Sequence, residues 1–300
     1  MTTHEAQPTS LQIGPYKAYS VPTGLFRLDG GAMFGTVPKV LWSKTNPTDE
    51  QNRILMECRT LLLVSDDRKV LIDTGNGSDF VAKYGEKFGG KFAEMFGVDQ
   101  SGTSLLSSLK KQGITPDQIT DVILTHLHFD HAGGATCDDG QGHIVPTFPN
   151  ATYYIQQANL DTARKPNRRE RASYLTPNFE PLFAHDVVKV LDGPTEVAPH
   201  IHVSISNGHT LGQQNVLVSD GKTSLFYCAD LIPTSTHIKL AWVMGYDIQP
   251  VLILEEKEKI LKQASENNWY LFFEHDPYVE AAQVAFDGKD FEVKKRFQLT

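Results

Sequence analysis

Cysteine is scarce in this chain of 300 residues, which has only Cys58, Cys137 and Cys228. Their odd number, wide separation and lack of a Cys-x-x-Cys spacing argue against a disulfide framework and favour a reducing compartment. Long apolar runs are also missing, since no window approaches the roughly 18 uninterrupted apolar residues of a membrane helix. The first 15 residues lack the pattern of a signal peptide. We therefore expect a soluble, cytoplasmic protein without a membrane partner.

Positive charge is the second shortage. The formal net charge is -8, and the one basic run, at 164–171, is interpreted as a solvated helix or loop. Nucleic-acid binding needs clustered Lys and Arg, so a nucleic-acid partner is not expected. With 40% hydrophobic residues the chain can bury a large core, and no linker divides it. We expect a single domain over residues 1–300 with an N-terminal arm at about 1–58, and the arm would suit a homodimer.

Short apolar runs alternate with helical patterns along the rest of the chain. Strands are predicted at 59–65, 69–72, 121–124, 151–155, 187–191, 202–206, 215–219, 224–228 and 269–273. Helices are predicted at 79–96, 105–112, within 156–171 and at 251–267, with a further helix start at 115–118. Interleaved helices with strand-rich hairpins in each half favour two mixed sheets flanked by helices, the α/β (α+β) class, over one parallel sheet.

The richest cluster of potential metal ligands follows the strand predicted at 121–124. It holds His126, His128, Asp130 and His131 within six residues. Alternation along an extended segment turns His126 and His128 to the same side, and the turn that follows lets Asp130 and His131 aim at a second position. Imidazole nitrogens and carboxylate oxygens suit zinc and its neighbours. This one segment could therefore supply ligands to two metal ions.

Three more candidates each stand at the end of a predicted strand, namely His209, Asp230 and His275. A lone surface or core residue is the ordinary interpretation of any one of them, so the repeated placement is the argument. Structural zinc sites close with four protein ligands, whereas seven ligands over two metals leave room for water. Catalysis is therefore favoured, with a non-catalytic zinc-stabilised binding protein as the alternative of another class.

These motifs together resemble the metallo-β-lactamase superfamily over residues 60–280. The resemblance implies a four-layer αβ/βα sandwich of two mixed sheets with helices outside. It also implies a dinuclear centre in which His126, His128 and His209 hold one metal, Asp130, His131 and His275 hold the second, and Asp230 bridges them. Asp73, in the segment Leu-Ile-Asp-Thr-Gly, is then expected to orient a ligand histidine from behind.

The resemblance gives this centre two divalent ions, expected to be zinc, although the same ligands accept manganese, cobalt or iron. Two such ions lower the pKa of a shared water and polarise a substrate oxygen, so a bridging hydroxide is expected to attack an ester-like bond. Asp130 and Asp230 are the candidate catalytic carboxylates that carry a proton to the leaving oxygen. The sequence does not choose between them.

Residues 28–39 and 124–134 look most like the branch of N-acyl homoserine lactonases and methyl parathion hydrolases. The resemblance implies a small-molecule lactone substrate, and so quorum quenching, with phosphotriester or aryl ester hydrolysis as the alternative. One position departs from the lactonases, which have a tyrosine three residues after the bridging aspartate where this chain has Pro233. His237 or Tyr227 could replace that hydrogen-bond donor, and a purely structural role is equally open for each.

The segment at 30–42 combines glycines with Met33, Phe34 and Trp42 and is predicted to be a loop near the mouth of the cleft. We expect Phe34, Trp42 and Phe129 to line an acyl or aryl pocket, with His237 beside it. Packing in the core is the rival interpretation, since large aromatic side chains are mostly structural.

Overall fold

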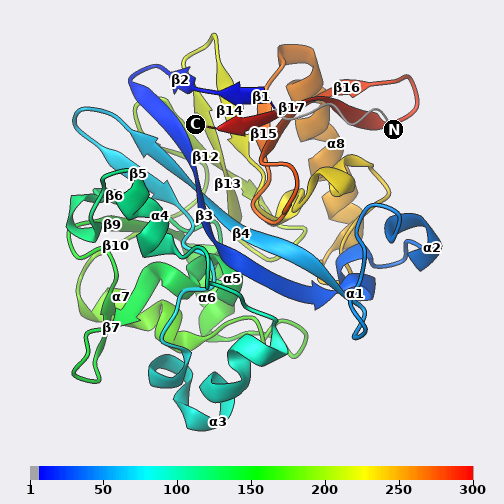
Figure 1. Ribbon diagram of the computed structural model, residues 1–300. Helices are drawn as coiled ribbons and strands as arrows, with labels where there is room; N and C mark the ends of the chain where they lie inside the picture. Colours follow the sequence, from blue (N-terminus) through cyan, green and yellow to red (C-terminus); the bar gives the residue numbers. More distant parts are fainter. Residues whose placement is uncertain (1–6, 300) are drawn as a thin grey trace. The chain divides into compact units, whose positions relative to one another are not determined.

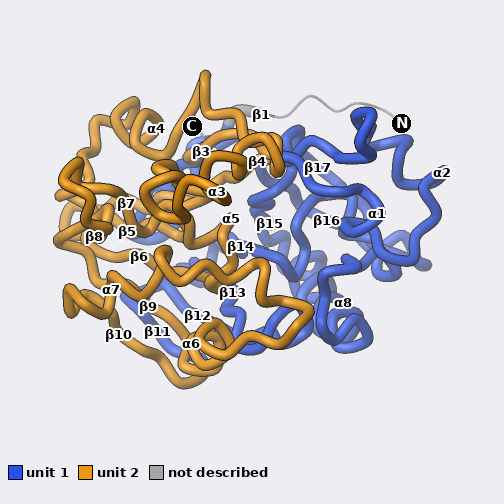
Figure 2. The backbone as a smooth tube through the Cα atoms, turned by 90° about the horizontal axis from the view of Figure 1, so that it is seen from below, with its two compact units in different colours: residues 1–20, 27–56, 194–300 blue, residues 21–26, 57–193 orange. Residues whose placement is uncertain are grey.

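The computed structural model describes residues 7–299, which Figure 1 shows coloured along the sequence. The chain divides into two compact units, drawn in different colours in Figure 2. Unit 1 comprises residues up to 20, residues 27–56 and residues from 194 onward, and unit 2 comprises residues 21–26 and 57–193. That residues 1–300 act as a single domain stays a prediction. Within 7–299, no helix has both the length and the apolar character needed to cross a membrane.

An eight-stranded mixed sheet forms the frame of unit 1. Its spatial order is β1 (Gln7–Thr9), β17 (Phe291–Leu299), β16 (Ala281–Phe286), β15 (Tyr270–Phe272), β14 (Ser224–Tyr227), β13 (Gln213–Ser219), β12 (Ile201–Ser206) and β11 (Thr195–Ala198). The pairs β1–β17 and β14–β15 are parallel, and the other neighbours are antiparallel. Helix α8 (Pro250–Asn267) packs against β16 and buries its apolar face, including Ile253 and Leu261, in the core of this unit.

The residues at 30–42 form two short helices rather than the predicted loop. They are α1 (Gly30–Phe34) and α2 (Lys39–Trp42), both in unit 1. Helix α1 begins where it does because the side chain of Asp29 accepts a hydrogen bond from the backbone N–H of Ala32 at 2.8 Å, which caps the first turn. Aspartate before two glycines indicates a turn as readily as a helix cap, which is why the pattern misled.

The second large sheet has seven strands and is mixed, and four of these strands belong to unit 2. Its spatial order is β10 (Val188–Leu191), β9 (Thr152–Gln156), β6 (Asp121–Ile123), β5 (Lys69–Ile72), β4 (Arg53–Val64), β3 (Tyr16–Asp29) and β2 (Leu11–Ile13). The four strands of unit 2, β5, β6, β9 and β10, are parallel, and β4 and β5 form an antiparallel hairpin. The ends of β3 and β4 are assigned to unit 1, where β2 pairs with the first residues of β3.

Unit 2 also contains five α-helices and one small hairpin. The helices are α3 (Phe80–Met95), α4 (Leu105–Lys111), α5 (Phe129–Ala132), α6 (Gln157–Arg164) and α7 (Glu180–Ala184), and the hairpin pairs β7 (Thr136–Asp138) with β8 (Ile144–Pro146). Helix α3 is kinked at Gly85, whose φ of 78° breaks the helical path. The predicted helix start at 115–118 is a single 3₁₀ turn, Pro116–Gln118.

The predicted fold class is confirmed, because both sheets are mixed and helices flank them. The predicted strands and the long helices recur with ends shifted by a few residues. The sequence did not indicate eight of the strands, namely β1, β2, β3, β7, β8, β11, β16 and β17. Residues 7–58, set apart in the sequence as an arm, form strands of the two sheets and the helices α1 and α2. Strand β1 illustrates the difficulty, since Gln7 pairs with Phe297 at the opposite end of the chain.

Candidate metal centre

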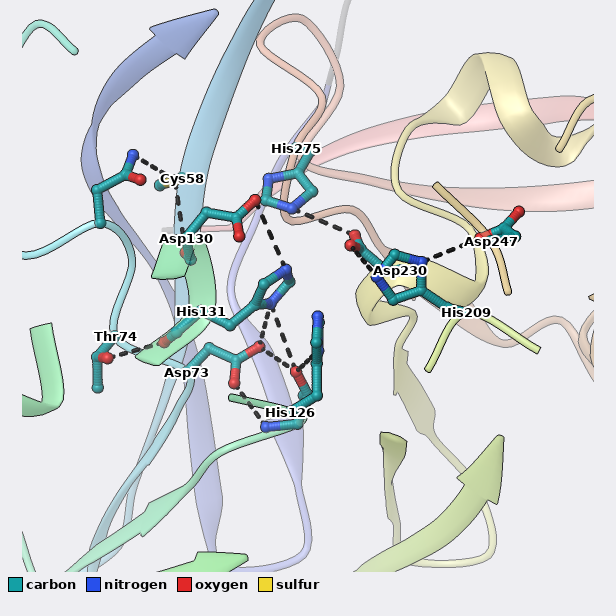
Figure 3. Close-up of polar contacts among 12 residues, drawn as sticks. Cys58, Asp73, Thr74, His126, Asp130, His131, His209, Asp230, Asp247 and His275 are labelled. Carbon is teal, nitrogen blue, oxygen red and sulfur yellow. Dashed lines mark hydrogen bonds and ion pairs between the residues drawn. The ribbon is translucent and has the colours of Figure 1, made fainter. Parts of the chain in front are cut away.

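Unit 2 gathers four of the predicted ligands on the loop that leaves β6 and on α5. His126, His128, Asp130 and His131 are all buried, with exposed fractions of 1%, 7%, 7% and 0%. The ring of His126 has its centroid 4.5 Å from that of His128 and 3.9 Å from that of His131. Asp130 Oδ2 lies 4.0 Å from His131 Nε2 (Figure 3). The unit therefore brings three imidazoles and a carboxylate together from six consecutive residues.

Asp73 supports this group from the end of β5. Its Oδ1 accepts a hydrogen bond from the backbone N–H of Thr125 at 2.7 Å, and its Oδ2 lies 2.7 Å from Thr125 Oγ1 and 3.1 Å from His131 Nδ1. An ionised carboxylate only accepts hydrogen bonds, so Nδ1 of His131 carries the hydrogen and Nε2 keeps its lone pair for a metal. Asp73 has the left-handed φ of 60° that places its side chain here.

Two backbone segments of unit 2 approach closely behind the same loop. The backbone N–H and the hydroxyl of Thr74 both donate to the carbonyl oxygen of His131 at 2.8 Å. A Cβ added to Gly133 would stand 2.1 Å from the carbonyl oxygen of Asn76. Only glycine permits this approach, which fixes the turn after His131 against the end of β5.

Asn159 on α6 and Tyr174 hold the first half of the loop, and neither stood out in the sequence. Asn159 Oδ1 accepts a hydrogen bond from the backbone N–H of Leu127 at 2.9 Å, while its amide group donates to Tyr174 Oη at 3.3 Å. The ring of Tyr174 packs 4.6 Å from that of His128. A helix residue and a loop residue far along the chain therefore orient His128, and no local pattern marks them.

Unit 1 brings the remaining three candidates together at the ends of its strands. Strands β14 and β15 are parallel with Tyr227 paired to Phe272, so Asp230 and His275, each three residues further on, emerge at the same edge. Asp230 Oδ2 lies 3.1 Å from Nε2 of His209, and its Oδ1 lies 3.2 Å from Nε2 of His275 (Figure 3). All three side chains are buried, with 2%, 6% and 1% exposed for His209, Asp230 and His275.

His209 also contacts Asp247, which the sequence gave no reason to single out. Nδ1 of His209 lies 3.0 Å from Asp247 Oδ1, and the backbone N–H of Ile248 donates to the carbonyl oxygen of His209 at 3.2 Å. Burial raises the pKa of the Asp247 carboxyl, while the hydrogen bond from His209 acts in the opposite direction. Asp247 follows no predicted strand, so the strand-end rule that found Asp230 could not find it.

The chemistry of these side chains fits a divalent cation. His209 has a carboxylate oxygen beside each ring nitrogen, but a neutral imidazole carries only one hydrogen, so one of these contacts is repulsive unless a positive charge compensates it. Two atoms that each lie about 2.0 Å from one tetrahedral zinc ion are roughly 3.3 Å apart. The separations of 3.1 and 3.2 Å around Asp230 are close to that value.

His237 uses both of its ring nitrogens inside unit 1. Nε2 donates a hydrogen bond to the carbonyl oxygen of Met33 at 2.8 Å, and Nδ1 lies 2.7 Å from the hydroxyl of Thr234. A carbonyl oxygen only accepts, so Nε2 carries the hydrogen and Nδ1 accepts from Thr234. Burial lowers the pKa of His237 to about 3, which keeps the ring neutral. These contacts favour a packing role for His237 over that of the donor missing at Pro233.

The other pocket candidates also pack within their own units. Phe34 stacks on Trp42 and on His237, with ring centroids 5.1 and 4.7 Å apart. The side chains of Phe34 and Trp42 are each 1% exposed or less. Phe129, in unit 2, packs against Phe92 and Phe96. Tyr227 is fully buried and stacks on Phe272. The acyl or aryl pocket stays a prediction, and the burial of Phe34 and Trp42 strengthens its rival, core packing.

Replacing Trp42 with alanine is expected to lower the free energy of unfolding by about 3 kcal/mol, because it removes a buried ring stacked on Phe34. Urea titration measures this loss, and Leu41→Ala on the same helix, where the side chain is 45% exposed, is the control expected to cost far less. A KM that stays the same for substrates of every acyl length in the folded Trp42→Ala variant would contradict the pocket and leave the packing role.

Comparisons with known proteins agree with this geometry. A family model described as the metallo-beta-lactamase superfamily matches residues 55–275. An N-acyl homoserine lactonase from a Bacillus species is 27% identical over 267 residues, covering 87% of this chain and 93% of the relative. Among solved structures, a probable metal-dependent hydrolase from Staphylococcus aureus is 28% identical, with a TM-score of 0.84 over 95% of this chain and 98% of the other.

A second solved structure is described as a dizinc quorum-quenching lactonase, AidC, in complex with its product N-hexanoyl-L-homoserine. It has a TM-score of 0.76 and 20% identity, covering 98% of this chain and 99% of the other. At that identity the likeness shows a shared fold.

Proposed function

Because this chain belongs to the metallo-beta-lactamase superfamily, we propose that it opens the ring of a lactone such as an N-acyl homoserine lactone, and so quenches a quorum-sensing signal. The chain is a metal-dependent hydrolase acting on ester bonds. Its family and its lactonase and hydrolase relatives support this activity. The observation that carries the proposal furthest is Asp230, whose two carboxylate oxygens each face the Nε2 atom of a buried histidine.

The proposed ligand set is the one that the family resemblance implies. His126, His128 and His209 would hold one metal, Asp130, His131 and His275 would hold the second, and Asp230 would bridge them. Support comes from each unit taken by itself, since every one of these side chains is buried and each lies beside another of the set. Zinc is the proposed metal, because the nitrogen and oxygen donors suit it, and manganese, cobalt and iron are the alternatives.

The chain's own residues prepare the reaction. Bound divalent metal would lower the pKa of a water and polarise the carbonyl oxygen of the lactone. Asp73 holds the Nδ1 hydrogen of His131 and so keeps Nε2 of that ring available as a ligand. Asp130 and Asp230 are acceptors buried beside the imidazoles, and we propose that one of them carries the proton to the leaving oxygen as the ring opens.

Lactone substrates are favoured by the relatives. Besides AidC, a further solved lactonase holds N-hexanoyl-L-homoserine at its catalytic metal centre, with 23% identity to this chain. The position of Pro233, where lactonases have tyrosine, keeps phosphotriester or aryl ester hydrolysis as the second candidate. A cytoplasmic location and a homodimer are further parts of the proposal.

A substrate panel tests the function. Zinc-loaded protein is mixed separately with N-hexanoyl homoserine lactone, N-decanoyl homoserine lactone, an aryl ester and a phosphotriester. Hydrolysis of each compound is measured by the protons that it releases. Protein stripped with chelator, before and after zinc is added back, is the control. Lactone opening that falls with chelator and returns with zinc supports the proposal. Turnover of the phosphotriester or aryl ester alone would move the assignment to the second candidate, and no zinc-dependent turnover would favour a binding protein.

A further inference from the structure

We propose that Asp247 is a positioning residue that fixes which ring nitrogen of His209 carries the hydrogen and thereby sets the affinity of the site for its metal. The inference rests on the proposed metal function of His209 and adds a residue outside the seven ligands. Asp247 and His209 are 38 positions apart in the chain, and the residues around Asp247 carry no metal-ligand motif.

Each oxygen of Asp247 lies within hydrogen-bonding distance of one nitrogen atom. Oδ2 accepts from the backbone N–H of Met244 at 2.8 Å, and Oδ1 lies 3.0 Å from Nδ1 of His209. Asp247 is 2% exposed, so water cannot replace either contact freely. The backbone adds two bonds, from Ile248 N–H to the carbonyl oxygen of His209 and from Gln249 N–H to that of Gly208. The carboxylate is thus held against the ring from both the side chain and the main chain.

The direction of the His209 hydrogen bond decides which nitrogen can bind a metal. A carboxylate beside Nδ1 requires the hydrogen to lie on Nδ1, which leaves the lone pair on Nε2. Nε2 is the atom that faces Asp230 Oδ2, at 3.1 Å. Asp247 therefore presents His209 in the one neutral form whose lone pair points to the proposed metal position, in the way that carboxylates behind ligand histidines raise metal affinity.

Asparagine at position 247 has nearly the same shape but only one acceptor. If its oxygen stays with the N–H of Met244, its amide N–H faces Nδ1 of His209 and forces the hydrogen onto Nε2, where it blocks the metal. If the side-chain amide of asparagine flips, its N–H group faces the backbone N–H of Met244, and two buried donors without an acceptor between them destabilise the fold. Alanine removes both acceptors and leaves the ring free to adopt either form. A positioning role thus predicts that Asp247→Asn harms metal binding more than Asp247→Ala, whereas simple packing predicts the opposite order.

The test measures zinc affinity by chelator competition for the wild type, Asp247→Asn, Asp247→Ala and Asp290→Asn. Asp290 is a matched control in the same unit, since its Oδ1 accepts from the backbone N–H groups of Leu240 and Phe291 and an asparagine oxygen can keep both bonds. We expect Asp247→Asn to weaken the binding of one zinc equivalent by about 10- to 100-fold, Asp247→Ala by less, and Asp290→Asn to match the wild type. Equal affinity for Asp247→Asn and wild type, or a larger loss for alanine, would overturn the inference.

A second measurement needs no variant. Long-range proton–nitrogen NMR of zinc-loaded wild type is expected to show His209 with its hydrogen on Nδ1, and a hydrogen on Nε2 would overturn the inference even if Asp247→Asn does not fold. Neither readout involves a substrate. If wild type binds zinc but hydrolyses no compound of the panel, the proposed function alone is contradicted. If the enzyme is active and the Asp247 variants bind zinc as tightly as wild type, this inference alone is contradicted.

Discussion

Replacing Asp230 with asparagine is expected to lower kcat/KM for lactone opening by about 1000-fold. The two oxygens of Asp230 each face a histidine Nε2, so the amide would place an uncharged N–H group where one acceptor stood. The loss of negative charge also weakens metal binding, because a buried carboxylate is the natural counter-charge of a divalent cation. Steady-state hydrolysis with saturating zinc measures the loss of turnover, and metal analysis of the purified protein measures the loss of zinc.

Asp130→Asn separates catalysis from metal binding. Asp130 lies further from its neighbouring imidazole, with Oδ2 4.0 Å from His131 Nε2, and we expect this variant to lose turnover while it keeps its fold and most of its metal. The control is Asp290→Asn, which makes the same chemical change away from the proposed ligands and should leave kcat/KM unchanged. Full activity in both Asp130→Asn and Asp230→Asn would contradict the catalytic roles proposed for these two carboxylates.

Replacing Lys257 with methionine is expected to lower the free energy of unfolding by on the order of 5 kcal/mol. Lys257 lies on α8 and is fully buried, and its ammonium group donates to the carbonyl oxygens of His237, Lys239 and Trp242 at 3.0, 2.9 and 2.8 Å. Methionine fills a similar volume but donates nothing, so three acceptors lose their partner at once. Urea titration at pH 7 measures the change, and Lys262→Met, at an exposed position of the same helix, is expected to alter stability by less than about 0.5 kcal/mol.

The same lysine makes stability depend on pH. Burial lowers the pKa of Lys257 to about 7 from its ordinary 10.5, and burial does the same to Lys83 in unit 2. Between these two values the unfolded chain binds more protons than the folded one, so the free energy of unfolding rises with pH, by at most about 1.4 kcal/mol per pH unit for each lysine. Below pH 7 both states are protonated and this dependence ends.

Lys257→Met should therefore remove about half of the rise that the two lysines produce between pH 7 and 8.5, while Lys262→Met keeps all of it. Urea titrations at three pH values within that window give the slopes. A slope that is the same in Lys257→Met and wild type would contradict the lowered pKa of Lys257, and a loss of stability below 1 kcal/mol at pH 7 would show that its amino group is not what ties α8 to residues 237–242.

The sequence could predict the proposed ligands because their placement is largely local. His126, His128, Asp130 and His131 lie within six residues, and the end of one buried strand delivers them all to one place. His209, Asp230 and His275 were found by a rule of similar simplicity, that side chains just beyond strand ends point out of the sheet. Parallel pairing of β14 with β15 brings Asp230 and His275 side by side, as their equal spacing from the strand ends suggests.

Tertiary structure decided which residues stand behind the ligands. Asp247, Asn159 and Tyr174 act through partners from 15 to 38 positions away, and a hydrogen bond over that distance leaves no periodic trace in a sequence. Lys257 lies among the charged residues of α8, so its sequence context indicates a solvated side chain. In the structure it is buried and donates hydrogen bonds to three carbonyl oxygens. From the sequence, His237 is a candidate hydrogen-bond donor to substrate. In the structure its two ring nitrogens contact Thr234 and the carbonyl oxygen of Met33.

What the sequence determined by itself is thus the class of fold and the residues proposed as ligands, since hydrophobic periodicity and the spacing of His and Asp are local properties of a chain. What only the folded structure decided is which groups lie beside the ring nitrogens of His131, His209 and His237, and which charged side chains are buried. Those depend on hydrogen bonds and on exclusion of water, and both arise only when segments remote in sequence pack against one another.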